Sequence, residues 1–233
     1  MRVRLLWFDR ETHMRGIFIT GTGTNVGKTV VAAALMHRFR TTIPLCYWKP
    51  IQTGIERSDD TATVRMLGKC ADPEFFGEGI RLRGSLSPHL AARQEGREID
   101  LDRLVQMPSA AHAELRWLVE GAGGVLVPIN DWHMMADLIA RLDLAVLVVA
   151  ASTLGTINHT LMTLETLRRR SRRIAGVVMV GDPNRDNRES IERFGQVDVI
   201  GELPHFPSLS PENLATWART ELDPNGSLLE LLR

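Results

Sequence analysis

The sequence predicts a single α/β domain, with a doubly wound, mainly parallel sheet and helices on both faces. Short apolar runs alternate with helical patterns from residue 14 to the end of the chain. The run at residues 144–151 is apolar throughout, as is typical of a strand buried on both faces. The 233 residues are enough for one well-packed domain, and no repeat or low-complexity linker divides them.

The composition excludes several classes of partner. Lys plus Arg and Asp plus Glu both number 28, so no net charge attracts nucleic acid or an anionic membrane surface. No apolar stretch is long enough to cross a membrane. The two cysteines indicate reduced thiols rather than a disulfide framework, which favours a cytoplasmic protein. Residues 1–13 are too short for a cleaved signal peptide, and we expect a disordered extension before a domain at residues 14–233.

A phosphate-binding loop follows the first predicted strand, residues 16–20. Residues 21–29 are rich in glycine, end in Gly27, Lys28 and Thr29, and open into a helical pattern at residues 30–40. Strand, glycine loop, Gly-Lys-Thr and helix form the phosphate loop of nucleoside triphosphatases. Lys28 would reach the outer phosphates, and the Thr29 hydroxyl would hold Mg²⁺. Five residues separate Gly21 from Gly27 where the usual pattern has four.

Two further segments place charged groups near this loop. Residues 43–48 form a predicted strand that ends at Lys49, followed by a loop at residues 49–54. Ligands of an open parallel sheet bind beyond the carboxyl ends of its strands, so Lys49 would face the phosphate loop; the alternative is a solvated surface lysine. Residues 117–119 form a strand ending at Glu120, which favours a Mg²⁺ carboxylate over a merely solvated side chain. Gly123 lies in the glycine-rich segment after it.

Between and beyond these segments the pattern is mostly helical. Ser58, Asp59 and Asp60 precede a helix at residues 61–69, either as caps or with one carboxylate directed at Mg²⁺. We expect a long loop at residues 72–84, a helix at 87–95 with Pro88 in its first turn, and one or two helices at 99–116.

The second half of the chain continues the alternation. A helix follows the apolar strand and runs from about residue 155 to 170, and its N-terminus is a second potential anion site. The basic residues 168–173 complement its C-terminus rather than bind nucleic acid. Strands at 174–180 and 197–201 and helices at 211–218 and 227–232 complete the domain.

Six motifs in order resemble the dethiobiotin synthetase family, over about the whole chain from residue 14. They are residues 21–29, Lys49-Pro50 with Gly54, Asp60, residues 87–89, residues 120–124 and residues 155–158. The family's phosphate loop has the same additional residue. The resemblance implies a P-loop NTPase-like fold and an ATP-dependent cyclo-ligase. Its substrates would be 7,8-diaminononanoate, CO₂ and ATP, with Mg²⁺ as cofactor, and its product dethiobiotin would form through a carbamate and a carbamic-phosphoric anhydride.

The resemblance also assigns roles to residues. Lys49 matches the lysine that bridges carbamate and γ-phosphate, and Lys28 is the second catalytic lysine. Asp60, with Asp59 as its rival, joins Thr29 and Glu120 as metal ligands. A homodimer is implied, in which residues 155–158 hold the substrate carboxylate across the interface. The expected nucleotide-binding residues are Thr24, Asn25, Val26, Gly27, Lys28, Thr29, Val30, Glu120, Gly123, Pro204 and His205, and the expected substrate-binding residues are Thr53, Pro88, Gly155, Thr156, Ile157 and Asn158.

The chain departs from the family pattern at two places. Gly23 and Asn25 stand where Asp and Glu are usual, which reduces repulsion beside a triphosphate. Residues 180–184 replace the Asn-Asp with which some members read adenine, so the base preference stays open.

Three alternatives remain. A cobyrinate synthetase-like ligase needs a glutaminase domain for which 233 residues leave no room. A partition-type ATPase switch has a second lysine early in the phosphate loop, where this chain has Thr22 and Gly23. A nucleotide-binding module without turnover would not need Lys49 and two carboxylates.

Overall fold

A computed structural model describes residues 14–108 and 114–233. Its main sheet has seven strands, all parallel, in the order β4-β2-β6-β1-β7-β8-β9. The predicted extension at residues 1–13 lies outside the described residues and stays a prediction. The strands are β1 (Arg15–Gly21), β2 (Leu45–Trp48), β4 (Phe75–Phe76), β6 (Arg116–Gly124), β7 (Ala145–Ala151), β8 (Ile174–Val180) and β9 (Val199–Leu203).

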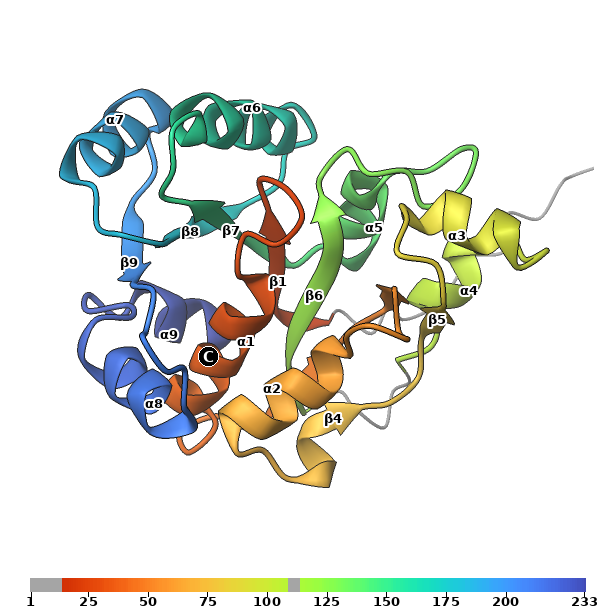
Figure 1. Cartoon of the computed structure of the whole chain (residues 1–233), viewed down its shortest axis with the longest axis horizontal. Coiled ribbons are helices and arrows are strands. Elements are labelled where there is room, and N and C mark those ends of the chain that lie inside the picture. The colour runs from red at the N-terminus through yellow and green to blue at the C-terminus, as the bar shows by residue number, and fades with distance from the viewer. Residues whose placement is uncertain (1–13, 109–113) are drawn as a thin grey trace, which may run out of the picture.

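Helices cover both faces of this sheet, so the predicted doubly wound α/β fold is confirmed. Figure 1 shows α5, α6 and α7 on one side of the sheet and α1, α2, α8 and α9 on the other. Each layer buries its own apolar cluster against the strands. The helices are α1 (Lys28–Phe39), α2 (Asp60–Gly68), α3 (Pro88–Gln94), α4 (Leu101–Val105), α5 (Met135–Leu142), α6 (Thr156–Arg169), α7 (Arg185–Gly195), α8 (Pro211–Thr220) and α9 (Ser227–Leu232).

Two predicted segments differ from the structure. The expected loop at residues 72–84 contains a 3₁₀ turn (Asp72–Glu74), edge strand β4 and strand β5 (Ile80–Leu82). β5 pairs in parallel with β3 (Ile51–Thr53) as a separate two-stranded sheet, so the predicted loop after Lys49 is also partly a strand. These strands have only two or three residues, too few to show an alternating pattern.

The expected helix or helices at residues 99–116 are confirmed only in part, and residues 109–113 of that range lie outside the described residues. Only α4 is helical among the described residues there, and Arg116 already begins β6. Asp100 caps α4 by accepting from the Arg103 amide, which explains where this short helix begins. Helices α5 and α7 were not predicted from the sequence.

The topology brings the two halves of the chain together beside β1. β1 lies between β6 and β7, and the chain leaves β1 through α1 toward the β2 side of the sheet. The carboxyl ends of β1, β2 and β6 therefore meet at one edge, which is where open α/β sheets bind ligands. Lys28, Lys49 and Glu120 all lie at or near these ends.

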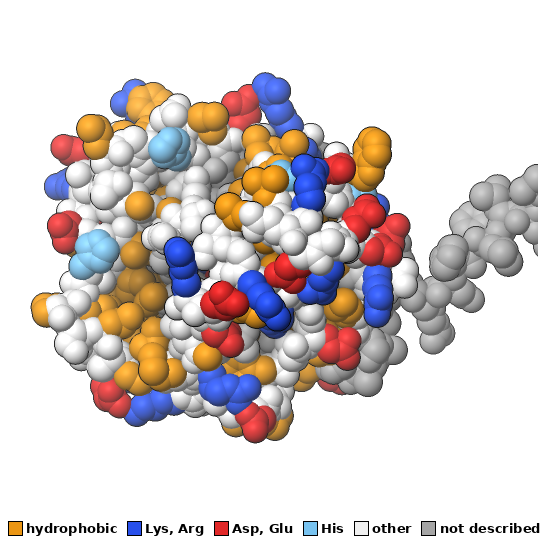
Figure 2. Space-filling view, turned by 45° about the vertical axis from the view of Figure 1, so that its right-hand side comes forward, with side chains coloured by type: hydrophobic (Ala, Val, Ile, Leu, Met, Phe, Trp, Pro, Cys, Tyr) orange, Lys and Arg blue, Asp and Glu red, His pale blue; other side chains and the backbone are white. Residues whose placement is uncertain are grey.

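The surface carries charges of both signs. Figure 2 shows Lys, Arg, Asp and Glu side chains interspersed over the face that it presents. Among residues 14–108 and 114–233, no helix is long and apolar enough to cross a membrane.

Candidate active site

The phosphate loop presents unpaired backbone amides at the start of α1. Gly27, the N-cap residue, has a φ of 96° and no side chain to satisfy the first turn of the helix. The first amides of a helix have no acceptor within the helix, so they remain available to an anion. Thr22 donates its amide to the Val149 carbonyl at 2.9 Å, which attaches the loop to β7.

The glycines of this loop have different steric roles. A Cβ on Gly27 would lie 2.9 Å from Cγ1 of Val180, in addition to the strained φ. A Cβ on Gly23 would meet only Cγ1 of Val26, at 3.9 Å. Asn25 has a φ of 59°, a left-handed conformation that asparagine tolerates better than most residues. Gly27 is therefore required by the fold of the loop, whereas Gly23 is not.

Lys49 forms the centre of a buried charge cluster. Its Nζ atom lies 2.6 Å from Oδ2 of Asp60 and 2.7 Å from Oε1 of Glu120, and it also donates to the Gly121 carbonyl at 3.1 Å. Burial alone would lower the pKa of Lys49, but the two carboxylates raise it above its ordinary value. Lys49 is therefore a fixed cation at neutral pH and not a solvated surface lysine.

Glu120 is fully buried, and three donors hold its carboxylate. Oε1 accepts from Lys49 and from the Thr29 hydroxyl, at 2.7 and 3.0 Å. Oε2 accepts from the Tyr47 hydroxyl at 2.8 Å. The carboxylate at the end of β6 is thus connected to the phosphate loop through Thr29 and to β2 through Tyr47 and Lys49.

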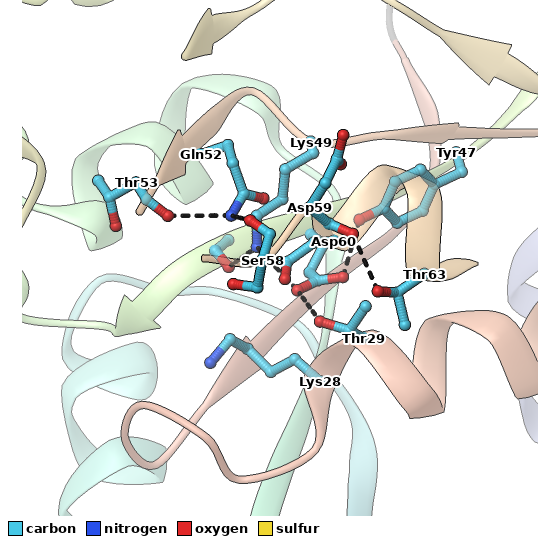
Figure 3. A network of polar contacts seen from close by, with 12 residues as sticks. Lys28, Thr29, Tyr47, Lys49, Gln52, Thr53, Ser58, Asp59, Asp60 and Thr63 are labelled. Atoms are coloured by element: carbon cyan, nitrogen blue, oxygen red, sulfur yellow. Dashed lines mark hydrogen bonds and ion pairs between the residues drawn. The ribbon is translucent and has the colours of Figure 1, made fainter. Parts of the chain in front are cut away.

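The structure separates the roles of the two adjacent aspartates. Asp59 is the N-cap of α2, and its side chain accepts from the Ala62 amide at 3.0 Å. Asp60, in the first turn, directs its carboxylate to Lys49 instead. Figure 3 shows Asp60 between Lys49 and Thr29, with Asp59 connected toward Thr63. The geometry therefore favours Asp60 over Asp59 as a site residue.

Lys28 extends along the phosphate loop. Its Nζ donates to the Gly23 carbonyl at 3.0 Å, and the side chain is largely buried. Burial, and after it the neighbouring Lys49, lower the pKa of Lys28 to about 8. The two ammonium groups therefore stand close enough to oppose one another, as expected where several negative charges are to be bound.

These groups line one cleft of about 760 Å³. It brings together most of the predicted nucleotide-binding, substrate-binding and metal-binding residues. The predicted residues that line it are Thr24, Asn25, Gly27, Lys28, Thr29, Val30, Lys49, Thr53, Asp60, Pro88, Glu120 and Gly123.

The remaining predicted residues lie elsewhere. Val26 packs beside Gly21 within the phosphate loop. His205 lies next to Gly181, just beyond β8, and Pro204 precedes it after β9. Residues 155–158 begin α6 and do not line the cleft. Gly155 repeats the geometry of Gly27, as an N-cap with a φ of 93° and no side-chain cap.

Three residues near the site were not predicted from the sequence: Tyr47, Gln52 and Arg81. Gln52 lines the cleft, and its amide nitrogen donates to the carbonyls of Thr53 and Ser58. Arg81 donates to the Lys49 carbonyl at 2.9 Å from strand β5, which was not predicted. Tyr47 lies two positions before Lys49, so a strand through both would place them on one face, but this spacing does not reveal the contact with Glu120.

Comparison with known proteins identifies the family. The model of the AAA domain family matches residues 15–213. The ATP-dependent dethiobiotin synthetase BioD of Paramagnetospirillum magneticum is 48% identical over 202 residues, which cover 87% of this chain and 94% of that protein. The protein of the same name from Agrobacterium fabrum is 42% identical over 196 residues, covering 84% and 89%.

More distant proteins share the fold alone. A ParA family ATPase from Chlorobium tepidum has a TM-score of 0.56 at 10% identity, covering 89% of this chain and 98% of that one. The McdA–ATP complex of Cyanothece has a TM-score of 0.58 at 12% identity, covering 95% and 96%. Because the dethiobiotin synthetases match at 40% identity or more over most of their length, the chain belongs to the dethiobiotin synthetase family of ATP-dependent ligases.

Proposed function

We propose that the chain carboxylates and cyclises 7,8-diaminononanoate to dethiobiotin, with CO₂ and ATP as co-substrates and with release of ADP and phosphate. The observation that carries this proposal is the Lys49–Asp60–Glu120 cluster, which lies in the same cleft as the phosphate loop. A passive nucleotide-binding module has no need of a buried ammonium held between two carboxylates beside its loop.

The reaction brings two anions together. One substrate amine takes up CO₂ to form a carbamate and loses a proton. A carbamate oxygen then attacks the γ-phosphorus of ATP, and the bond to ADP breaks. The second amine attacks the carbonyl carbon of the mixed anhydride, and phosphate leaves as the cyclic urea forms. These steps need charge neutralisation and positioning rather than a side-chain nucleophile.

The two lysines fit this requirement. Lys28 lies along the phosphate loop, where an ammonium reaches the outer phosphates, and Lys49 lies just beyond β2 and lines the same cleft. We assign Lys49 to the space between carbamate and γ-phosphate. In that position it reduces the repulsion between nucleophile and electrophile while both are held in line.

The oxygen ligands available here fit Mg²⁺. The Thr29 hydroxyl and the carboxylates of Asp60 and Glu120 are hard donors of the kind that Mg²⁺ takes. No group of three or more His, Cys, Asp and Glu side chains gathers in the described parts of the chain, so phosphate oxygens and water would complete the coordination. When bound, the ion would neutralise charge on the phosphates.

The base and the substrate carboxylate need further contacts. We assign the base to the segment with Pro204 and His205, because His205 lies beside Gly181 and the neighbouring Val180 packs on Gly27. Thr53 and Pro88 line the cleft and are assigned to the substrate. The carboxylate is assigned to residues 155–158 of a second subunit, where Leu154 is fully exposed and the Thr156 hydroxyl is buried without a partner among the described residues.

The partition-type ATPase is not favoured. ParA-like structures match at only 10 to 13% identity, which supports a common fold and no common activity. The dethiobiotin synthetases match at much higher identity and over nearly their whole length. A cobyrinate synthetase-like ligase has no support among these relatives.

Purified protein tests the reaction. It is incubated with 7,8-diaminononanoate, bicarbonate and MgATP, and phosphate release and dethiobiotin are measured together. We expect equal amounts of both, and no phosphate release above background without the diamine. ATP hydrolysis that is indifferent to the diamine would refute the proposal and favour a switch ATPase.

Mixing two inactive variants tests the subunit arrangement. Lys49→Ala disables one half of the proposed site and Gly155→Asp the other, because the added carboxylate repels the substrate anion. If each site uses both subunits, a mixed dimer retains one intact site, so an equal mixture recovers roughly a quarter of the activity. No recovery, or a monomer in analytical ultracentrifugation with substrate present, would contradict the shared site.

A further inference from the structure

Tyr47 is tightly packed on strand β2, two residues before Lys49. It is fully buried, and its ring packs edge-to-face against Phe75 of β4 with the centroids 5.8 Å apart. Across the sheet it stands opposite Leu118 of β6, two residues before Glu120. Side chains two positions apart on a strand share a face, so the Tyr47 ring reaches diagonally to the carboxylate.

The Tyr47 hydroxyl donates a hydrogen bond to the one oxygen of Glu120 that neither Lys49 nor Thr29 contacts. Lys49 and Thr29 both donate to Oε1 of Glu120, whereas Tyr47 donates to Oε2 at 2.8 Å. Burial, followed by the adjacent Glu120, raises the pKa of Tyr47 well above its ordinary value, so it remains a neutral donor. Figure 3 shows the Tyr47 hydroxyl directed toward the part of the site that contains Asp60 and Thr29.

A terminal carboxylate turns easily about its last bond, because that torsion has broad minima. Anchoring one oxygen removes this freedom and leaves the other in a defined direction. We propose that Tyr47 is a positioning residue that fixes the Glu120 carboxylate with Oε1 directed at Thr29 and Lys49. The inference rests on the proposed function, since it assumes that Glu120 and Thr29 serve the metal–nucleotide complex.

Tyr47→Phe tests this role with a readout that needs no turnover. The variant keeps the ring and its packing and removes only the donor. Mn²⁺ serves as the probe, and its binding to the protein–ADP complex is followed by electron paramagnetic resonance. Partners that orient a metal ligand typically contribute tenfold or more to metal affinity, so we expect the Mn²⁺ dissociation constant to rise about tenfold. Affinity for ADP without metal should be unchanged.

Trp48→Phe is the matched control. Trp48 is the next residue of the same strand, is equally buried, and donates its indole N–H to the Glu78 carbonyl at 2.8 Å, away from Glu120. Its variant also loses one hydrogen bond of a buried side chain, so a general loss of packing would weaken Mn²⁺ binding in both. Equal weakening in the two variants would overturn the proposal, as would unchanged Mn²⁺ affinity in Tyr47→Phe.

A double variant shows whether Tyr47 acts through Glu120. In the Glu120→Gln background, Tyr47→Phe should change Mn²⁺ affinity no further, because the group that it positions is already altered. Additive effects would overturn the role. The double variant also keeps the test usable if Tyr47→Phe alone fails to fold, since it no longer leaves a buried carboxylate oxygen without a donor. Absence of dethiobiotin formation by the parent protein would refute the proposed function without affecting these binding results.

Discussion

The Nζ atom of Lys49 lies 2.7 Å from Oε1 of Glu120, and both side chains are almost completely excluded from solvent. The two residues are 71 positions apart in sequence and meet because β2 and β6 are neighbours in the sheet. A buried pair of this kind is weak evidence for stability, because desolvation offsets much of the attraction. Its position in the same cleft as the phosphate loop instead indicates a role in the site.

Lys49→Ala should nearly abolish turnover while preserving nucleotide binding. Removal of one well-placed charge donor at a reacting centre typically lowers kcat by about 10²–10³-fold. Among the described residues, the Lys49 ammonium pairs with Asp60 and Glu120 and donates to the Gly121 carbonyl, all outside the phosphate loop, so affinity for ADP should change little. Removal of the ammonium also leaves Glu120 and Asp60 without their common cation, and we expect a loss of about 3 kcal/mol in the free energy of unfolding.

Lys69→Ala provides the control for this variant. Lys69 pairs with Glu212 on the surface and is more than half exposed, so its loss should change stability by less than about 1 kcal/mol. Phosphate release, ADP titration and chemical denaturation are compared across the two variants. A fully active Lys49→Ala protein would show that Lys49 is misassigned.

Substitutions of the two adjacent aspartates should have different effects, one on stability and the other on the Mg²⁺ dependence of turnover. Asp59→Ala removes the cap of α2 and should cost about 1 kcal/mol of stability with activity retained. Asp60→Asn should raise the Mg²⁺ concentration needed for half-maximal turnover by tenfold or more, with little change in thermal stability. Thermal unfolding and Mg²⁺ titrations of turnover distinguish them. The reverse result would make Asp59 the metal ligand.

The phosphate loop should tolerate alanine at one glycine and not at another. Gly27→Ala places a Cβ 2.9 Å from Val180 at a φ of 96°, so we expect at least a tenfold loss of ADP affinity. Gly23→Ala meets nothing closer than 3.9 Å and should bind ADP within about twofold of the parent. Calorimetric titration measures both. Similar losses in the two variants would contradict the steric argument.

The fold could be predicted because its long strands carry a strong pattern. The apolar run before residue 152 and the loop before Lys28 each identify an element and its place, and the structure agrees at β7, β8 and α1. The short strands β3 and β5 could not be predicted, because three residues show no period. α7 was missed because Ile191 and Gly195 alone are buried in it, so its apolar stripe is too sparse to detect.

Only those site residues that belong to a recognisable motif could be predicted from the sequence. The chain has three lysines, and the motifs singled out the two that line the cleft, Lys28 and Lys49. Tyr47 lies in a segment interpreted only as a strand, and its partner Glu120 is 73 residues away. That contact depends on the diagonal register of two strands, which no local pattern specifies.

His37 should make stability depend on pH below neutrality. Its Nε2 lies 2.7 Å from the Leu67 carbonyl, where it connects α1 to α2. Burial lowers the pKa of His37 below its ordinary value of 6.5, although the Leu67 carbonyl opposes this and the cations Arg40 and Arg219 add to it. Well above pH 6.5 the ring is neutral in both folded and unfolded protein and contributes no pH dependence. As pH falls through 6.5 the unfolded chain binds a proton first, so stability is lost until the folded ring is also protonated.

His37→Gln keeps a donor N–H for the Leu67 carbonyl but cannot titrate. Denaturation at pH 7.5 and 5.5 should therefore show a larger loss for the parent than for the variant. Since every other titrating group is common to both proteins, equal losses would mean that the ring titrates alike in the folded and unfolded states.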